Sequence, residues 1–218
     1  MSESIPLGNI QQPGDSERTE RRDAAANRVR ILEVADRLFA EHGVENVNMA
    51  DIAAAAGVGK GTLYRRFGSK AELCLSLMDT QLQQFQERQL EALRQMTMSE
   101  APKLEQLAHF LDALVAFTAR HMPLLCEVQQ QSQQLDEAEV ERPHFWQYMT
   151  VHGLLQAAVN GGELPGGLDT TALAEALLAP LGADTFRFQA RVLGLTPERV
   201  SAGLRTLVMG LQQLAEQD

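Results

Sequence analysis

Gly57 separates two short stretches of helical periodicity, and this pattern constrains the fold more than any other feature of the sequence. Residues 49–56 carry a narrow apolar face of mostly small side chains, namely Ile52, Ala53 and Ala56. Glycine then follows, where a left-handed backbone has no β-carbon penalty. In residues 60–67, Leu63 and Phe67 lie four apart on one face. The sequence therefore predicts two short helices that cross closely at a tight turn.

Capping residues set the expected ends of the neighbouring helices. Asn48 can accept hydrogen bonds from the first free backbone donors, and Asp51 three residues later completes a variant of the capping box. Ser69 and Glu72 form the same type of box further on. The first short helix should therefore begin directly after Asn48, and a long helix should run from the second box to about residue 94.

The second short helix presents a cationic and aromatic outer face. Its outward side chains are Lys60, Thr62, Tyr64, Arg65 and Arg66. A short helix, a glycine turn and a basic second helix are the arrangement that places a recognition helix in the DNA major groove. The alternative is an ordinary solvated charged face. Turn chemistry and spacing favour groove entry.

A phosphate-binding loop is the competing motif at this position. Gly59-Lys60-Gly61-Thr62 resembles the end of such a loop, which requires Gly at position 54 and Ser or Thr directly after the lysine. Ala54 and Gly61 occupy those positions instead, so the nucleotide-binding interpretation is excluded.

At these residues the chain resembles the TetR family of transcriptional regulators. The matching residues are Asp51-Ile52-Ala53, Ala56-Gly57-Val58, Lys60-Gly61-Thr62-Leu63-Tyr64, Phe67 and Ser69-Lys70-Ala71-Glu72-Leu73, with Leu38, Phe39, Ala40 and Gly43 upstream. The resemblance implies an all-α protein with an N-terminal three-helix helix-turn-helix domain and a larger helical ligand-binding and dimerisation domain. It also implies a dimer that reads two half-sites of a palindromic operator.

The DNA-binding residues predicted on this basis are Lys60, Gly61, Thr62, Tyr64, Arg65, Arg66 and Lys70. Arg65 and Arg66 could read bases, and the hydroxyl and lysine side chains would contact phosphates, with Lys60 shared between the two roles. The sequence departs from the family pattern at Gly59, where Ser is common, and at Met49, where Thr is common. Both departures remove a polar side chain from the expected DNA surface.

Charge is distributed in a way that agrees with a local DNA-binding surface. The whole chain carries a net charge of −10, but residues 16–73 hold ten Lys or Arg against nine Asp or Glu, a net charge of +1. The acidic excess therefore lies elsewhere, and an electrostatic contact with phosphates is confined to a few groups.

The N-terminal residues are expected to be irregular. Residues 1–17 are polar, contain two prolines and lack periodicity, which predicts a disordered tail. Arg18, Arg21 and Arg22 follow, just ahead of the first expected helix. They could form an arm that contacts DNA, or a soluble helix start balanced by neighbouring acidic residues. The predicted domains are this tail, a DNA-binding domain over 18–69 and a ligand-binding and dimerisation domain over 70–218.

The remaining chain is expected to be helical as well. Leu and Ala are abundant, hydrophobic residues make up 44% of the chain, and no two-residue alternation is sustained. Helix starts are expected at Ser99 or Pro102, at Pro123, at Pro143, after Asp169 and at Pro197. No apolar run is long enough to span a membrane and no signal peptide is recognised, so we expect a cytoplasmic location.

Two apolar helices near the C-terminus need a partner. The penultimate helix carries Leu173, Leu177, Leu178 and Leu181, and the last carries Val200, Leu204, Leu207, Val208, Leu211 and Leu214. They could pair with a second copy as a four-helix interface, or complete the core of one chain.

The C-terminal helices are also expected to enclose an apolar site for a small-molecule effector. The candidate lining residues are Phe85, Phe110, Phe117, His121, Trp146, Met149, His152 and Phe186. Each could instead be a plain core residue. Trp146, Met149 and His152 recur every third position on one helix, which favours a site that mixes stacking and polar groups.

No catalytic or metal-binding pattern is recognised. Glu141 and His144 would need a second Glu-x-x-His pair to bind a di-iron centre, and none is present. Cys74 and Cys126 are expected to be small buried residues. We therefore expect a regulator that is not an enzyme and has no cofactor. A helical ligand-binding or docking module that does not bind DNA is the alternative.

Overall fold

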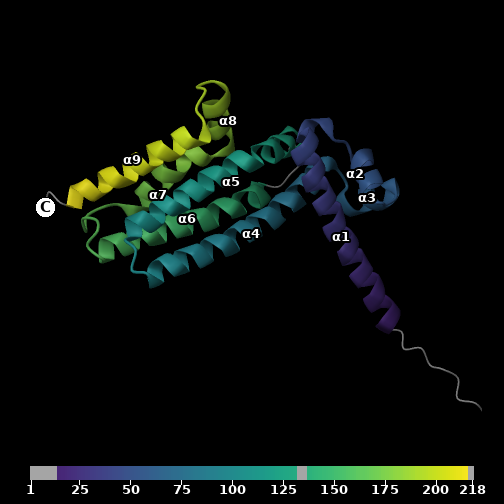
Figure 1. Ribbon diagram of the computed structural model, residues 1–218, viewed down its shortest axis with the longest axis horizontal. Helices are drawn as coiled ribbons and strands as arrows, with labels where there is room; N and C mark the ends of the chain where they lie inside the picture. The colour runs from purple at the N-terminus through teal and green to yellow at the C-terminus, as the bar shows by residue number, and fades with distance from the viewer. Residues whose placement is uncertain (1–13, 132–136, 216–218) are drawn as a thin grey trace, which may run out of the picture. The chain divides into compact units, whose positions relative to one another are not determined.

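The computed structural model describes residues 14–131 and 137–215, and this part of the chain contains helices and no strand. Figure 1 shows the succession of helices along the chain. The elements are α1 (Gly14–His42), the 3₁₀ helix η1 (Val44–Asn46), α2 (Met49–Ala55), α3 (Lys60–Phe67), α4 (Lys70–Met98), α5 (Lys103–Gln131), α6 (Glu137–Asn160), α7 (Thr170–Leu178), η2 (Ala179–Leu181), α8 (Ala183–Arg191) and α9 (Pro197–Ala215). The all-α fold predicted from the sequence is confirmed.

The chain divides into two units by its internal contacts. The N-terminal unit comprises Met1–Leu73 and the C-terminal unit Cys74–Asp218. The division falls inside α4, so one continuous helix begins in the first unit and continues into the second. The domain boundaries predicted at residues 17 and 69 stay predictions.

The N-terminal unit is a helix-turn-helix packed on α1. Its buried core is apolar and is formed by Ile31, Leu32, Ala35, Phe39, Val44, Ile52, Leu63 and Phe67, among others. Gly57 has φ +64°, and its N–H donates to the Ala54 carbonyl at 3.2 Å. The Val58 N–H donates to the Ala53 carbonyl at 3.0 Å. This is the hydrogen-bond pattern of a Schellman motif, which ends α2 and turns the chain into α3.

The C-terminal unit is a layer of helices around one hydrophobic cluster. Figure 1 shows α5 between α6 and α9, both of which it contacts. The cluster takes Phe85 from α4, Leu107, Phe110 and Leu114 from α5, Val151 and Leu155 from α6, Leu177 and Leu178 from α7, and Val200, Leu204 and Val208 from α9. These apolar contacts hold the unit together, because burial of apolar surface is the main favourable term in folding.

Three helix starts differ from the expectations. Helix α1 begins at Gly14, so Arg18, Arg21 and Arg22 lie within it and not ahead of it, while residues 1–13 lie outside the described part of the chain. Pro123 lies inside α5, and α6 already begins at Glu137, ahead of Pro143. In α5 the buried Leu114, Leu124 and Val128 lie on both sides of the proline. Packing of both halves therefore outweighs the lost backbone hydrogen bond.

Other starts agree with the sequence. The Asp169 side chain caps α7 by accepting from the backbone N–H of Thr171 at 3.1 Å and of Ala172 at 3.0 Å, and α9 begins at Pro197. Cys74 is buried and Cys126 only half buried, and neither forms a disulfide with another of the described residues. In the described part of the chain, no helix combines the length and the hydropathy needed to cross a bilayer.

Candidate DNA-binding surface

Helix α3 buries one face and exposes the other. Leu63 and Phe67 are fully buried against the N-terminal core. Of the predicted DNA-binding residues, Lys60, Gly61, Tyr64, Arg65 and Arg66 are exposed, while Thr62 and Lys70 are half buried. Tyr64 keeps 51% of its surface exposed, so much of a large aromatic side chain faces solvent here. The outer face of α3 is therefore available to a partner.

The beginnings of the two neighbouring helices are capped as the sequence predicted. The Asn48 Oδ1 accepts from the backbone N–H of Ala50 at 2.8 Å and of Asp51 at 3.1 Å. In return the Asp51 carboxylate accepts from the Asn48 N–H at 3.0 Å, which completes the capping box. At the start of α4, the Ser69 hydroxyl accepts from the Glu72 N–H at 3.2 Å. These bonds fix the residues at which α2 and α4 begin, before and after α3 in the chain.

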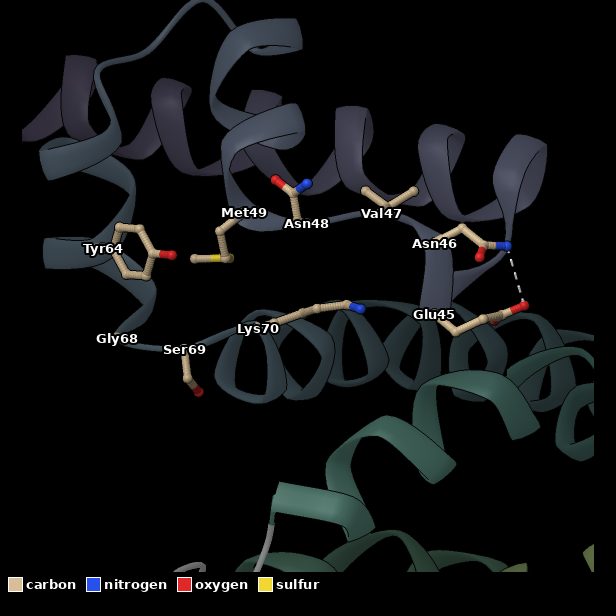
Figure 2. Close-up of a pocket in the computed structure, with 9 residues that line it drawn as sticks. All are labelled: Glu45, Asn46, Val47, Asn48, Met49, Tyr64, Gly68, Ser69 and Lys70. Atoms are coloured by element: carbon tan, nitrogen blue, oxygen red, sulfur yellow. Dashed lines mark hydrogen bonds between the residues drawn. The ribbon is translucent and has the colours of Figure 1, made fainter.

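A pocket of about 530 Å³ lies beside the exposed face of α3. Its lining residues are Glu45, Asn46, Val47, Asn48, Met49, Tyr64, Gly68, Ser69 and Lys70. Figure 2 shows the Tyr64 ring reaching the pocket from α3 and the Lys70 side chain extending along it from the first turn of α4. The Lys70 ammonium points away from Tyr64, toward the end of the pocket at Asn46 and Glu45. The pocket thus offers a hydroxyl and an ammonium group at separate places beside the N-terminus of α4, a setting in which an anionic group such as a phosphate can be bound.

Met49 makes part of the pocket wall apolar. This side chain is buried, and it lies between Asn48 and Tyr64 in the pocket wall (Figure 2). A thioether is a weak acceptor and no donor, so it adds apolar packing where a hydroxyl could have donated a hydrogen bond. The polar side chains that line the pocket are those of Glu45, Asn46, Asn48, Tyr64, Ser69 and Lys70.

The two arginines of α3 have different surroundings. The Arg66 guanidinium donates to the backbone carbonyl of Ala24 in α1, and the neighbouring Arg28 lies over the Phe67 ring at 5.8 Å from its centroid. Arg65 is exposed and has no hydrogen bond or ion pair to any of the described residues. Arg66 thus braces α3 against α1 in this conformation, whereas the Arg65 side chain is exposed.

The predicted effector residues form a partial cluster in the C-terminal unit. The Phe85 ring lies 6.3 Å from Phe110, 4.6 Å from Phe117 and 6.1 Å from Trp146, measured between centroids. The His121 ring lies 4.3 Å from Phe117. The structure therefore brings Phe85, Phe110, Phe117, His121 and Trp146 together, and the buried Phe186 belongs to the same hydrophobic cluster.

Met149 and His152 do not lie with Trp146 on one face. Met149 is 49% exposed, and the His152 ring stacks on Tyr148 at 5.6 Å while its Nε2 lies 3.3 Å from the Thr170 hydroxyl. A spacing of three residues turns an α-helix by 300°, so each step moves the side chain about 60° around the axis. Met149 and His152 thus have other surroundings than the Trp146 ring, and their predicted contact with an effector stays a prediction.

Two buried polar residues of this unit were not among the effector-site residues predicted from the sequence. Gln89 is buried on α4, one turn after Phe85, and Thr118 is buried on α5 next to Phe117. The signal that could have found Gln89 is its spacing, because it occupies an inward position of the apolar pattern of α4. The described residues bring no three His, Cys, Asp or Glu side chains together as a metal-binding group.

Most of the apolar residues expected to pair two copies near the C-terminus are buried within the single chain. Leu177, Leu178 and Leu181 of the predicted penultimate helix are buried within the chain, as are Val200, Leu204 and Val208 of α9. The exposed apolar side chains lie instead on and just after α8, which the sequence had not distinguished, and on α9. They are Phe188, Val192, Leu193, Leu207 and Met209.

Comparison with known proteins places the helix-turn-helix in a family. Residues 31–77 match the model of the bacterial regulatory proteins, tetR family. Over 105 residues the chain is 39% identical to an HTH-type transcriptional regulator of Staphylococcus aureus strain MRSA252, a match that covers 48% of this chain and 55% of that one. The chain thus spans about half the length of this curated relative.

Solved structures share the fold over most of the chain. A transcriptional regulator from Saccharomonospora viridis, in complex with choline, aligns with a TM-score of 0.69 at 20% identity and covers 85% of this chain and 96% of its own. AibR in complex with isovaleryl coenzyme A and operator DNA aligns with a TM-score of 0.56 at 21% identity, covering 83% and 97%. The helix-turn-helix segment at residues 31–77 is thus similar to the bacterial regulatory proteins of the tetR family.

Proposed function

We propose that the protein is a one-component transcriptional repressor that binds a palindromic DNA operator as a homodimer and is released by a small molecule. The observation that carries the proposal is the outer face of α3, where Lys60, Tyr64 and Arg65 are exposed while Leu63 and Phe67 anchor the helix. A helix presented in this way can enter the major groove.

Each group on this surface has a proposed role. Arg65 reads a base, because a guanidinium can bind guanine through two parallel hydrogen bonds. Tyr64 and Lys70, which line one pocket, hold a backbone phosphate, and Lys60, Gly61 and Thr62 at the start of α3 approach the neighbouring phosphates. Arg66 contributes to DNA binding if it exchanges its contact with Ala24 for the nucleic acid.

The dimer is proposed to form through α8 and α9. Phe188 on α8 and Leu207 and Met209 on α9 are each more than half exposed in the single chain. Large exposed apolar side chains that gather on neighbouring elements mark interaction surfaces. A two-fold axis through this surface would give two recognition helices, which a palindromic operator requires.

The C-terminal unit is proposed to bind the effector and to control DNA binding through α4. Helix α4 begins with Lys70 and carries Phe85 in the aromatic cluster of the second unit. Chains of the same fold hold choline or isovaleryl coenzyme A, and the latter also holds operator DNA. An effector that binds one conformation of α4 better than another would shift the DNA affinity.

Selection of bound sequences from a random DNA pool tests the proposal. We expect a palindromic consensus whose affinity for the protein falls steeply with salt concentration. Arg65→Ala should weaken binding to this consensus by about tenfold or more, whereas Arg199→Ala, an exposed arginine at the start of α9, should not. Absence of enrichment with folded, dimeric protein would refute operator binding and favour a ligand-binding or docking module.

A further inference from the structure

Gln89 has an unpaired amide oxygen inside the C-terminal unit. The residue is 9% exposed, and its Oε1 is fully buried with no hydrogen-bond partner among the described residues. Buried side-chain oxygens are almost always paired in folded proteins, because burial without a partner forfeits their hydrogen bonds to water. The Gln89 amide therefore requires an explanation.

Gln89 lies on the same face of α4 as Phe85, a member of the aromatic cluster. Phe85 precedes it by four residues and Leu93 follows by four, and both pack against the hydrophobic core of the unit. Residues four apart lie on the same face of a helix. Gln89 is thus on the core-facing side of α4, one helical turn from Phe85, whose ring lies near those of Phe110, Phe117 and Trp146. Of these rings, Phe117 and Trp146 are only partly buried.

The other buried polar groups of this region carry no permanent charge. In the described part of the chain, the buried polar residues are Gln89, Gln106, Thr118, His121 and Thr170. Gln106 is already paired, since its amide bonds the Ala101 carbonyl at 2.9 Å and the Thr97 hydroxyl at 3.1 Å. Thr170 lies 3.3 Å from both His152 and Gln156. A carboxylate or phosphate bound in this interior would find no buried Lys or Arg among the described residues to neutralise it.

We propose that the effector is a neutral, largely apolar molecule whose hydroxyl or amide N–H donates a hydrogen bond to Gln89 Oε1 beside the aromatic cluster. This inference rests on the proposed effector-binding function of the C-terminal unit and specifies the ligand class. The rings supply apolar contact area, and the amide supplies the polar contact that fixes orientation. Gln89 is then a specificity-determining residue that discriminates against ligands without a donor and against anions.

Three probes with the same alkyl chain test the ligand class on the full-length protein. They are 1-octanol, which can donate a hydrogen bond, octyl methyl ether, which can only accept one, and octanoate, which is an anion at neutral pH. We expect 1-octanol to bind with a Kd about tenfold below that of the ether, the ratio that one additional hydrogen bond in a dry site produces. Octanoate should bind more weakly than 1-octanol. Thermal shift and titration calorimetry both measure this order.

Two matched variants assign the effect to one residue. Gln89→Leu should abolish the preference for 1-octanol over the ether, whereas Gln84→Leu, an exposed glutamine of the same helix, should preserve it. The ligand-free Gln89→Leu protein should have a Tm equal to or above that of the wild type, because an unpaired buried amide is replaced by an apolar group of similar size. A structural role for the amide would instead lower the Tm.

The proposal is overturned if octanoate binds as tightly as 1-octanol, if none of the three probes binds, if Gln89→Leu keeps the preference, or if its Tm falls. Operator binding is measured on the same preparations without any probe. Absence of ligand discrimination in the wild-type protein, with intact operator binding, would refute this inference alone. Ligand discrimination without operator binding would refute the proposed regulatory function and leave the ligand site standing.

Discussion

Glu163, in the loop after α6, caps helix α5 by accepting a hydrogen bond from the backbone N–H of Lys103 at 2.6 Å. Its second carboxylate oxygen accepts from the Leu104 N–H at 2.9 Å. The first backbone donors of a helix have no partner within the helix, so a carboxylate from the loop after α6 satisfies two of them. The negative charge also complements the positive end of the helix dipole.

We expect Glu163→Leu to lower the free energy of unfolding by about 1–2 kcal/mol, the usual range for loss of a helix N-cap. Glu163→Gln should be less destabilising because one amide oxygen can still accept a hydrogen bond. Urea unfolding of both variants, with an unchanged m-value, measures the difference. Equal stability of the leucine variant and the wild type would show that the cap contributes nothing.

The two glycines of the helix-turn-helix should respond oppositely to alanine. Gly57 has φ +64°, and since a β-carbon there would meet no atom within 4 Å, Gly57→Ala should destabilise only through backbone strain, by about 1–2 kcal/mol. Gly61 lies inside α3 with open space around it, so Gly61→Ala should stabilise the fold by about 0.5–1 kcal/mol. Thermal unfolding of the two variants compares the signs directly.

The contact between Arg66 and Ala24 predicts a difference between the two adjacent arginines. Arg66→Ala should reduce the free energy of unfolding by about 1 kcal/mol because it removes a hydrogen bond between α3 and α1. Arg65→Ala should change stability by less than about 0.5 kcal/mol, as exposed substitutions without partners usually do. Chemical denaturation in the absence of DNA isolates this effect from nucleic-acid binding. Identical values would contradict the bracing role.

A charge on the exposed apolar surface should prevent pairing of two copies. Leu207→Glu should give a folded monomer, because the side chain is 58% exposed in the single chain and its replacement disturbs no core contact. Leu90→Glu on α4 is a control of similar exposure outside α8 and α9. Sedimentation velocity and circular dichroism report mass and helix content. A dimeric Leu207→Glu protein would place the interface elsewhere.

Glu91 should titrate at unusually low pH. Hydrogen bonds from the Arg94 guanidinium, and then from Gln95, lower the pKa of Glu91 from 4.5 to about 2. Since the folded-state pKa is depressed, any stabilisation is fully present above about pH 4.5 and is lost as the pH falls towards 2. Arg94→Ala should return the pKa towards its ordinary value. Carboxyl NMR titration measures both, and an unchanged pKa in the variant would assign the shift to another group.

The helix-turn-helix could be predicted from the sequence because its signals are local. Asn48 and Asp51 bond each other three residues apart, and Gly57 is recognisable by residue type alone, so α2 and α3 begin where the pattern indicated. The exposed side of α3 follows from the burial of Leu63 and Phe67. The roles of the exposed residues in binding DNA stay predictions.

The C-terminal unit was predicted less well because its determinants are distant in sequence. Pro123 has the local character of a helix start, but apolar contacts of α5 on both sides of it decide the outcome. Glu163 stabilises a helix that begins 60 residues earlier in the chain. The spacing of Gln89 on α4 indicates an inward position, but only the fold brings rings of α5 and α6 against Phe85, one turn away on the same helix.

Trp146 is an intrinsic fluorescence probe of the C-terminal unit. It is the only tryptophan in the chain, and its indole lies edge-on to Phe85 and Phe110 in the C-terminal unit. Its emission therefore originates from a single environment, distant in sequence from α3. A change in emission when operator DNA is added to unlabelled protein would report communication between the two units directly, and its size at saturation would compare the communication in different variants.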